Sequence, residues 1–373
     1  MLGNPQRGLT SIRIAGSNGK GSTAALLEAI LAAHEVRTGL YTSPHLVRVE
    51  ERIRLAGRQI SSAEMSACLE RLERFPELTF FETLTLAAVL AFREAGIEVA
   101  VMEVGIGGRW DATGIAGSVV AGLTNVGSDH QSWLGFSREA IAAHKGAVLA
   151  DATVGVLGPG VDEEILPSLG ASRAIAAERL VRLSSGAAGA VEADWGDGPV
   201  PVTVPLAGSH QVANLHLALA LARAAADVGI APPLDGPAVR RGLASVSWPG
   251  RLSMHRVGGR EVLLDCAHNA EGVTALTAYL ESGQPRFNLL FSCLDDKPVA
   301  EMASRLQPLV GEVAVFELED ERAAPLDSLR SAFVGAHAAR NALEGLGRLE
   351  DPVLATGSLR VVGALLEYGE LGG

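Results

Sequence analysis

The amino-acid sequence predicts an α/β protein in which a P-loop domain with a mostly parallel sheet precedes a smaller Rossmann-like α/β domain. Over Ile12–Thr23 a strand-like run breaks into a glycine-rich loop and then a helix, the order expected of a phosphate-binding strand–helix unit. Two further apolar runs, Val99–Met102 and Val119–Leu123, have the composition of buried parallel strands. Strand and helix patterns alternate again after the Trp-Pro-Gly segment, so we expect domains over 1–246 and 247–373.

The first of these segments reads IRIAGSNGKGST. Backbone N–H groups of such a loop and the N-terminus of the following helix attract an anion, and Lys20 adds a mobile positive charge. The strict Walker pattern is not met, because Ile14 stands where its first glycine belongs and Gly21 follows the lysine. The loop alone therefore leaves open a tight turn with no phosphate ligand.

Polar residues follow both of the later apolar runs. Glu103 ends one run, with Asp111 a few residues on, and Asp129-His130 follows the other. Loops after parallel strands gather at one edge of the sheet, so we expect these side chains to converge on the phosphate loop. A carboxylate there suits Mg²⁺, and we expect Glu103 as a ligand with Ser43 and His130 beside it. From chemistry alone His130 is better explained as a hydrogen-bonded loop residue, since Mg²⁺ prefers oxygen.

The second domain carries its own polar cluster. Arg251 follows the domain break, and its planar guanidinium suits a phosphate. Asp265 ends a predicted strand and precedes the turn Cys266–Asn269. This turn has two explanations: a strand-to-helix connection with Asn269 as the N-cap, or a second face for a nucleotide.

Periodicity predicts the remaining elements. We expect a helix that contains Lys145 and ends at Gly146, followed by a strand-like run over 147–157. At Lys145 a solvated lysine near a helix C-terminus is the ordinary interpretation. A hairpin is predicted around Gly196–Gly198, and a helix over 326–340.

Composition limits the possible functions. The 373 residues carry a net charge of −12 and only 4% are aromatic, which argues against nucleic-acid and anionic-membrane binding. Cys68, Cys266 and Cys293 fit no disulfide or zinc spacing, as expected in a reducing compartment. The N-terminal segment lacks the apolar stretch of a signal peptide, and charges or Gly and Pro interrupt every apolar run before about 18 residues. We therefore expect a cytoplasmic protein.

Ordered motifs along nearly the whole chain resemble the folylpolyglutamate synthase and dihydrofolate synthase family, within the Mur ligase superfamily of ATP-dependent amide-forming enzymes. The motifs are LGNPQ, AGSNGKGST, YTSPHLVRVEERI, FFETLT, EVGIGGRWDAT, TNVGSDH, LAGSHQVAN, WPGRL, LDCAHN, DDK and TGSLRVVG. The SPH-ERI pair and EVGIGGRWDAT are the most specific of them.

The resemblance implies a Mur-ligase-type central domain followed by a Rossmann-like domain, acting as a monomer on small molecules. In this family a folate or pteroate carboxylate attacks the γ-phosphate of MgATP, and the amine of L-glutamate then displaces phosphate from the acyl phosphate. The motif matches assign phosphate binding to Gly19, Lys20, Gly21 and Ser22, and magnesium binding to Ser43, Glu103 and His130. They assign nucleotide contacts in the second domain to Arg251 and Asp265, with His268 and Asn269 beside them. They assign the pterin region to Phe81, Glu82 and Asp111. Lys145 stands where many superfamily members carry a carbamylated lysine near a second metal. Lys20, Glu103, His130 and Lys145 are thus the expected catalytic residues.

The chain departs from the family pattern at a few of these positions. It reads HKGAV where EKAGI is usual, Cys266 where Gly is usual, and Gly114 where Asn commonly follows Asp-Ala-Thr. The sequence begins almost directly at LGNPQ, without the leading segment that in related enzymes helps to bind the pterin, so the dihydropteroate activity is the part of the resemblance that carries over least. Another Mur-type amino-acid ligase, or a P-loop kinase of small metabolites, is the alternative function.

Overall fold

The computed structural model describes residues 2–127, 131–171, 174–186 and 190–371. Contacts divide the chain into two compact units, Met1–Pro205 with Gln211–Val246, and Leu206–His210 with Ser247–Gly373. The predicted functional domains, 1–246 and 247–373, stay a prediction. No helix formed by the described residues is long and apolar enough to cross a membrane.

Unit 1 is built on an eight-stranded sheet of order β4-β3-β2-β5-β1-β6-β7-β8. Its strands are β1 Thr10–Ala15, β2 Thr38–Tyr41, β3 Ile53–Leu55, β4 Arg58–Gln59, β5 Val99–Glu103, β6 Val120–Asn125, β7 Val154–Gly160 and β8 Ile175–Ala176. Six strands run parallel, and β3 and β4 add an antiparallel edge. The central strands β5, β1 and β6 are almost entirely buried because both of their faces are covered, although β1 carries the polar residues Ser11 and Arg13.

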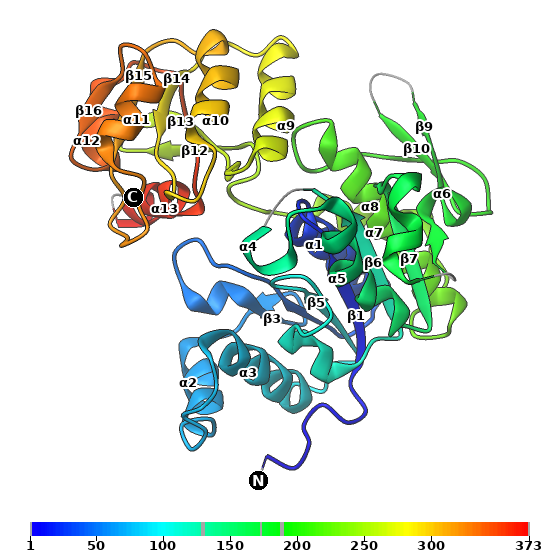
Figure 1. The fold of residues 1–373 in the computed structure, drawn as a ribbon. Helices are drawn as coiled ribbons and strands as arrows, with labels where there is room; N and C mark the ends of the chain where they lie inside the picture. The colour runs from blue at the N-terminus through cyan, green and yellow to red at the C-terminus, as the bar shows by residue number, and fades with distance from the viewer. Residues whose placement is uncertain (1, 128–130, 172–173, 187–189, 372–373) are drawn as a thin grey trace. The chain divides into compact units, whose positions relative to one another are not determined.

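Helices lie on both faces of this sheet (Figure 1). They are α1 Lys20–Ala33, α2 Ser62–Glu70, α3 Phe80–Glu94, α4 Gln131–Leu134, α5 Arg138–Ala150, α6 Ala177–Leu180, α7 His210–Asp227 and α8 Gly236–Ala244, with 3₁₀ turns η1 Val49–Arg52, η2 Ala112–Ala116 and η3 Glu163–Leu169. α3 packs on the side of the sheet that carries Ala100 and Met102. α5 packs on Ala15 and Leu123. α7 approaches the opposite side of β6, where Gly122 faces Leu221.

The predicted end of the Lys145 helix at Gly146 is wrong. α5 continues to Ala150, and β7 begins only at Val154. Gly146 lies inside the helix. The residue there must be glycine because a Cβ would be 2.2 Å from the carbonyl oxygen of Leu169. The glycine thus marks a close contact between α5 and η3 rather than a helix end.

A small antiparallel sheet follows η3, with order β11-β10-β9 and strands β9 Arg182–Ser185, β10 Val191–Asp194 and β11 Val200–Val202. β10 pairs with β11 across Gly196–Gly198, so the predicted hairpin is confirmed. The Ala- and Leu-rich α7 is largely buried, as expected from its continuous apolarity.

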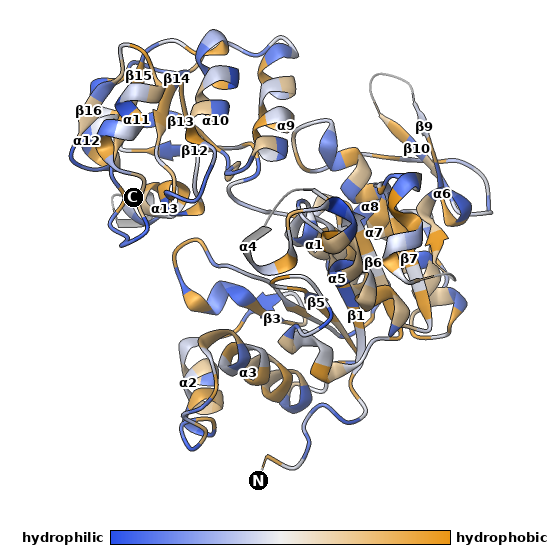
Figure 2. Ribbon diagram, in the orientation of Figure 1, coloured by the Kyte–Doolittle hydropathy of each residue, from blue (hydrophilic) through white to orange (hydrophobic). Residues whose placement is uncertain are grey.

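Unit 2 is a six-stranded sheet of order β12-β13-β17-β14-β15-β16. Its elements are β12 Ser253–Val257, β13 Arg260–Leu264, α9 Ala270–Glu281, β14 Asn288–Phe291, α10 Val299–Leu306, η5 Gln307–Leu309, β15 Val313–Phe316, α11 Leu326–Ala332, β16 His337–Ala339, α12 Ala342–Arg348, β17 Val353–Thr356 and α13 Leu359–Leu371. All strands are parallel except β12. The central strands β14 and β15 are hydrophobic along their length (Figure 2), consistent with burial on both faces. The predicted Rossmann-like alternation, and with it the α/β fold class, is confirmed.

The helix expected over 326–340 is wrong in its second half. α11 ends at Ala332, and β16 adds an edge strand beside β15 at His337–Ala339. Phe333 is fully buried in the core of unit 2, and an extended backbone at this residue replaces the last helical turns. Apolar periodicity could not distinguish a longer helix from a shorter helix and an edge strand.

Candidate active site

The phosphate loop connects β1 to α1 and has a backbone that only glycine adopts easily. Gly16 has a φ of 147° and Gly19 a φ of 82°. A Cβ on Gly16 would lie 1.8 Å from Oγ1 of Thr124, and one on Gly19 would lie 2.2 Å from Oδ1 of Asn214. Both glycines are therefore required by conformation and by close neighbours.

The end of β6 holds the loop in this shape. Oδ1 of Asn125 accepts hydrogen bonds from the backbone N–H groups of Ser17 (3.2 Å) and Asn18 (3.0 Å). Thr124 donates from Oγ1 to the carbonyl oxygen of Asn18 at 2.6 Å. Thr124 and Asn125 are not among the site residues expected from the sequence, although their place at the end of an apolar run was an available signal. The loop is thus ordered by the protein itself.

Two lysine side chains donate hydrogen bonds to the first carbonyl oxygen of the loop, that of Gly16. Nζ of Lys20 donates to the carbonyl oxygens of Gly16 at 3.0 Å and Ser17 at 3.3 Å. Nζ of Lys145 donates to the same Gly16 oxygen at 2.8 Å. Lys145 is only 1% exposed, so the solvated lysine expected from its place late in the predicted helix is wrong. It lies on α5 directly beside the phosphate loop.

The N-terminus of α1 provides uncompensated donors. Gly19 is its N-cap and offers no side chain to the first helical N–H groups, and its first turn contains no acidic residue. The hydroxyls of Ser22 and Thr23 are buried and have no hydrogen-bond partner within the part of the chain that the structure describes. Buried polar groups are normally satisfied, so these hydroxyls suit a ligand. Together with Lys20 they form a cradle for an anion.

Glu103 lies at the carboxyl end of β5, next to the end of β1. The register pairs it with Ile14, two residues before Gly16. Glu103 is 5% exposed, and its Oε2 accepts a 3.0 Å hydrogen bond from the backbone N–H of Ser43. The structure thus brings together two of the three residues expected to hold Mg²⁺. The third, His130, lies outside the described residues, and among the residues described no three His, Cys, Asp or Glu side chains form a metal cluster.

Asp111 organises the loop that follows Glu103. Its Oδ2 accepts hydrogen bonds from the N–H groups of Gly105 (3.0 Å) and Ile106 (3.3 Å), and its Oδ1 accepts from the backbone N–H (3.0 Å) and the hydroxyl (2.5 Å) of Thr113. Both oxygens are therefore engaged by the protein. Asp111 is also the N-cap of η2, which explains its local role without a substrate.

Phe81 and Glu82, expected in the pterin region, begin α3. Glu82 forms a capping box with Thr79, whose N–H and hydroxyl donate to Glu82 Oε2 at 2.8 and 2.7 Å. This capping lowers the pKa of Glu82, the hydroxyl contributing most. Phe81 packs against Gly105, where a Cβ would lie 2.7 Å from the ring. Phe81 thus lies beside the loop after Glu103, whereas Glu82 stabilises a helix end.

The segment after β2 contains a buried arginine that the sequence analysis did not select. Arg52 is 7% exposed, and its Nε donates to Nδ1 of His45 at 2.9 Å. Its guanidinium lies 5.3 Å from the ring centroid of Phe80. Burial is the main reason that the pKa of Arg52 falls below its usual value, and Tyr41 and Glu103 oppose this shift. A signal was present, since Arg48, Arg52, Arg54 and Arg58 follow closely after Pro44, but a solvated basic loop explains such a run of arginines equally well.

In unit 2, Asp265 shapes the turn between β13 and α9. Its Oδ2 accepts from the N–H of Leu252 at 3.1 Å and its Oδ1 from the N–H of Ala267 at 2.9 Å. Burial raises the pKa of Asp265, and the charge of Arg251 opposes this shift.

Asn269 is the N-cap of α9, where its Oδ1 accepts from the N–H of Gly272 at 2.7 Å. Nδ1 of His268 bonds the carbonyl oxygen of Cys266 at 2.8 Å. The four predicted residues of this unit therefore lie together.

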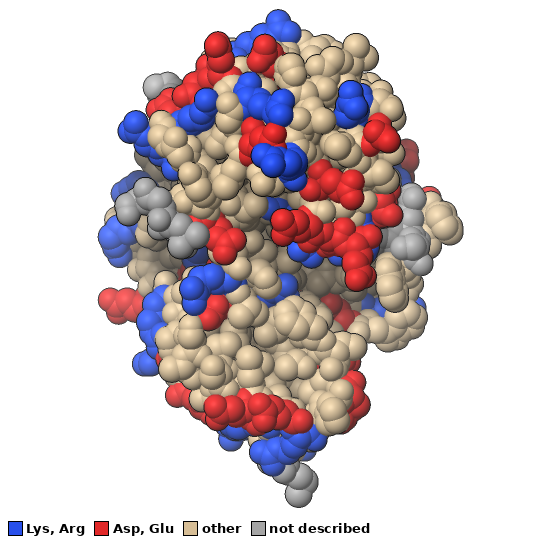
Figure 3. All heavy atoms as spheres, turned by 90° about the vertical axis from the view of Figure 1, so that its left-hand side faces the viewer, with Lys and Arg blue, Asp and Glu red and all other residues tan. Residues whose placement is uncertain are grey.

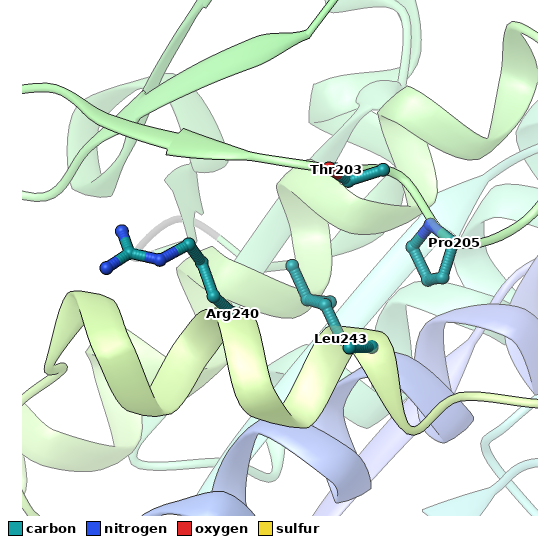
Figure 4. Close-up of a pocket in the computed structure, with 5 residues that line it drawn as sticks. Thr203, Pro205, Arg240 and Leu243 are labelled. Carbon is teal, nitrogen blue, oxygen red and sulfur yellow. The ribbon is translucent and has the colours of Figure 1, made fainter.

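A further cavity in unit 1 is formed by residues that were not expected in the site. A cavity of about 360 Å³ lies between the segment after β11 and α8, lined by Thr203, Pro205, Arg240, Leu243 and Ala244 (Figure 4). Its lining includes no predicted site residue. On the face seen in Figure 3, basic side chains are scattered among acidic ones.

The fold and the loop define the class of protein. The Mur ligase middle domain matches residues 14–222, more than half of the chain. A dihydrofolate synthase/folylpolyglutamate synthase of Mycobacterium tuberculosis is 37% identical over 369 residues, which cover 89% of this chain and 75% of that protein. The chain belongs to the folylpolyglutamate synthase and dihydrofolate synthase family of Mur ligases, as its motifs predicted.

Solved structures agree with this assignment. Escherichia coli FolC in complex with DHPP and ADP superposes with a TM-score of 0.88 at 27% identity, over 99% of this chain and 91% of that chain. The bifunctional folylpolyglutamate synthase/dihydrofolate synthase of Yersinia pestis, complexed with AMPPNP and a Mn ion, gives a TM-score of 0.84 at 30% identity, over 98% and 90%. These proteins bind adenine nucleotides in the same fold.

Proposed function

We propose that this protein ligates L-glutamate to a folate or pteroate carboxylate at the expense of ATP, releasing ADP and phosphate. The observation that carries the proposal is the phosphate cradle, formed by Lys20 and by a Ser22 hydroxyl that has no partner among the described residues, at the end of the strand that pairs with the strand of Glu103. Named relatives with this activity and nucleotide-bound structures of the same fold support it. The substrates are small molecules, and we propose a cytoplasmic monomer.

The phosphate loop would bind and orient the triphosphate. Backbone N–H groups at Gly19, Lys20 and Gly21 point toward the N-terminal end of α1, where an anion is favoured. Lys20 would leave its two carbonyl partners to contact the phosphates, adding positive charge where it develops during transfer. For unit 2 by itself, the motif match supports the proposal that Arg251 and Asp265, with His268 and Asn269 beside them, bind a nucleotide.

The residues present fit a divalent cation that accompanies ATP. Ser22 offers a buried hydroxyl that no described residue hydrogen-bonds, and Glu103 offers a carboxylate at a strand end; both are oxygen donors of the kind that Mg²⁺ prefers. Ser43, whose N–H is already bonded to Glu103, and His130 complete the proposed set. The cation would supply positive charge to the transferred phosphoryl group.

Amide formation needs two successive transfers. The acceptor carboxylate would attack the γ-phosphate, the bond to the β,γ-bridging oxygen would break, and ADP would leave as the acyl phosphate forms. The neutral amine of glutamate would then attack the acyl carbon, expelling inorganic phosphate and losing a proton. Phe81 and the Asp111 loop are the proposed acceptor side, since they adjoin the residues after Glu103. Lys145 would stabilise the phosphate loop during both steps.

The deciding experiment incubates the protein with MgATP, L-glutamate and either dihydropteroate or tetrahydrofolate, and identifies products by mass spectrometry. We expect a product heavier by one glutamyl residue together with stoichiometric ADP. Lys20→Ala and Glu103→Gln should abolish ADP release. Glu103→Gln retains an oxygen that can accept the Ser43 N–H, so its loss of activity would reflect charge rather than folding.

A P-loop kinase acting on a small metabolite is the competing function. It would give a phosphorylated product that is stable without glutamate. If ADP release is independent of glutamate and no amide forms with either acceptor, the ligase proposal fails.

A further inference from the structure

Arg13 is a charged residue in the middle of β1, and like its neighbours in this strand it is buried. It is 2% exposed and lies between Ile12 and Ile14, which are fully buried. A buried guanidinium is costly unless its donors are satisfied, so its partners indicate what it is there for. The catalytic scheme proposed above does not use it.

Those partners lie in the loop that follows Glu103. Nε of Arg13 donates to Oγ1 of Thr113 at 3.3 Å, and NH2 donates to the carbonyl oxygen of Gly108 at 3.2 Å. No carboxylate forms an ion pair with Arg13 among the described residues, although the charges of Asp111 and Asp151 act on it. Its strongest contacts are thus to two points of one loop.

A relay of hydrogen bonds continues from this arginine. Thr113 accepts from Arg13 and donates its own hydroxyl proton to Oδ1 of Asp111 at 2.5 Å. The other oxygen of Asp111 accepts from the N–H groups of Gly105 and Ile106, which come directly after Val104 and Glu103. Strand β1, which carries the phosphate loop at its end, is thereby connected to the backbone next to Glu103.

The loop of residues 105–114 exposes large apolar side chains, as expected of a surface that binds the acceptor substrate. Ile106 is 43% exposed and Trp110 is 81% exposed, although both are large apolar residues. The Trp110 ring lies 5.1 Å from the ring of His144, in an edge-on arrangement. Exposed apolar side chains at the carboxyl edge of a parallel sheet suit contact with an aromatic substrate.

Gly114 adjoins the same guanidinium. A Cβ on Gly114 would lie 3.6 Å from Nη2 of Arg13, an ordinary van der Waals distance, so Arg13 also packs against this end of the loop.

We propose that Arg13 is a positioning residue that fixes the loop of residues 105–114 through Thr113 and Asp111, and thereby sets the affinity for the acceptor but not for ATP. The inference rests on the proposed ligase function for its kinetic part. Its structural part, the order of the loop, stands independently of any activity.

The test compares Arg13→Met with Arg223→Met, a matched control. Arg223 also binds a backbone carbonyl of unit 1, that of Trp195, but lies on α7 away from this loop. Hydrogen exchange should show faster exchange at Gly105 and Ile106 in Arg13→Met only. Losing hydrogen bonds from a charged donor should raise the acceptor KM about 10-fold or more while the KM for ATP changes less than about 2-fold.

Thr113→Val provides a second variant that cuts the relay without removing the buried charge, in case Arg13→Met does not fold. Thr113→Val should reproduce both the faster exchange and the higher acceptor KM. Thr113→Ser keeps the hydroxyl, so its exchange and its acceptor KM should equal those of the wild type. Unchanged exchange at residues 105–114 in both Arg13→Met and Thr113→Val would overturn the inference whatever the enzyme's activity. Faster exchange with equal changes in the KM for acceptor and ATP would leave only a structural role and would also overturn it. An inactive wild type with the expected exchange pattern would instead refute the ligase function.

Discussion

Lys145 donates a hydrogen bond to the carbonyl oxygen of Gly16, a group that also accepts from Lys20. The shared acceptor suggests how the loop tolerates nucleotide binding. If Lys20 moves to the phosphates as proposed, Lys145 would still satisfy the Gly16 carbonyl. Without Lys145, that movement would leave a buried carbonyl unpaired, which costs about 1–3 kcal/mol.

Lys145→Met should therefore weaken ATP binding by about 10-fold or more, the equivalent of one lost buried hydrogen bond. Methionine preserves most of the side-chain volume, so the free energy of unfolding without ligand should change less than the binding energy. Calorimetric titration with MgATP measures the effect. Lys145→Gln is the control, since its amide can still donate a hydrogen bond. Equal ATP affinity in wild type and Lys145→Met would show that the lysine does not serve the loop.

Ser22 yields a prediction because its buried hydroxyl has no partner in the described structure. Ser22→Ala removes no intramolecular hydrogen bond, so thermal stability without ligand should stay equal or rise slightly. Binding of MgATP should fall by about 10-fold or more, because a ligand-directed oxygen is lost. Differential scanning calorimetry with and without MgATP separates the two effects. Ser22→Thr should retain nucleotide-induced stabilisation. A drop in Tm of the ligand-free Ser22→Ala protein would mean that the hydroxyl has a structural partner.

The sequence predicted the strand–loop–helix unit well because its signals are local. The glycines, Lys20 and the following helix are contiguous, and periodicity places them correctly. Likewise, Glu103 was placed at a strand end beside the loop by the general topology of parallel sheets, and register confirms that position.

Long-range contacts could not be predicted in the same way. Nothing near Asn125 in the sequence shows that its amide holds Ser17 and Asn18, more than a hundred residues away. The helix end expected at Gly146 failed for the same reason, since the contact with Leu169 that requires glycine forms only in the tertiary structure. The roles predicted for Asp111 and Glu82 rest on resemblance, whereas their local partners follow from capping geometry.

The three cysteines should be unreactive in the native protein. Cys68, Cys266 and Cys293 are buried, and burial raises their pKa values, to about 11 for Cys266 and about 12 for Cys293. Because the thiolate is the reactive form, reaction with a disulfide reagent at pH 8 should be negligible over minutes. After unfolding in guanidinium chloride three thiols should react. Rapid reaction of one thiol in the native state would show that its part of the core opens readily.

Tyr41 should make the folded state sensitive to alkaline pH. Its ring is fully buried, its hydroxyl is hydrogen-bonded to the Thr85 hydroxyl at 3.2 Å, and burial is the main cause that raises its pKa from 10.0 to about 12. The phenol ionises in the unfolded chain first, so its contribution to stability is complete below pH 10 and is lost as pH rises toward 12. A shift of this size corresponds to about 3 kcal/mol.

Tyr41→Phe should remove this part of the pH dependence while leaving folding intact. The Thr85 hydroxyl keeps a partner in the variant, because it also bonds the carbonyl oxygen of Phe81 at 2.8 Å. Denaturant unfolding between pH 8 and 11 measures the difference in free energy, and tyrosinate absorbance, taken as wild type minus variant, should titrate near pH 12. Identical slopes of stability against pH above 10 in the two proteins would mean that Tyr41 ionises as easily in the folded state as in the unfolded one.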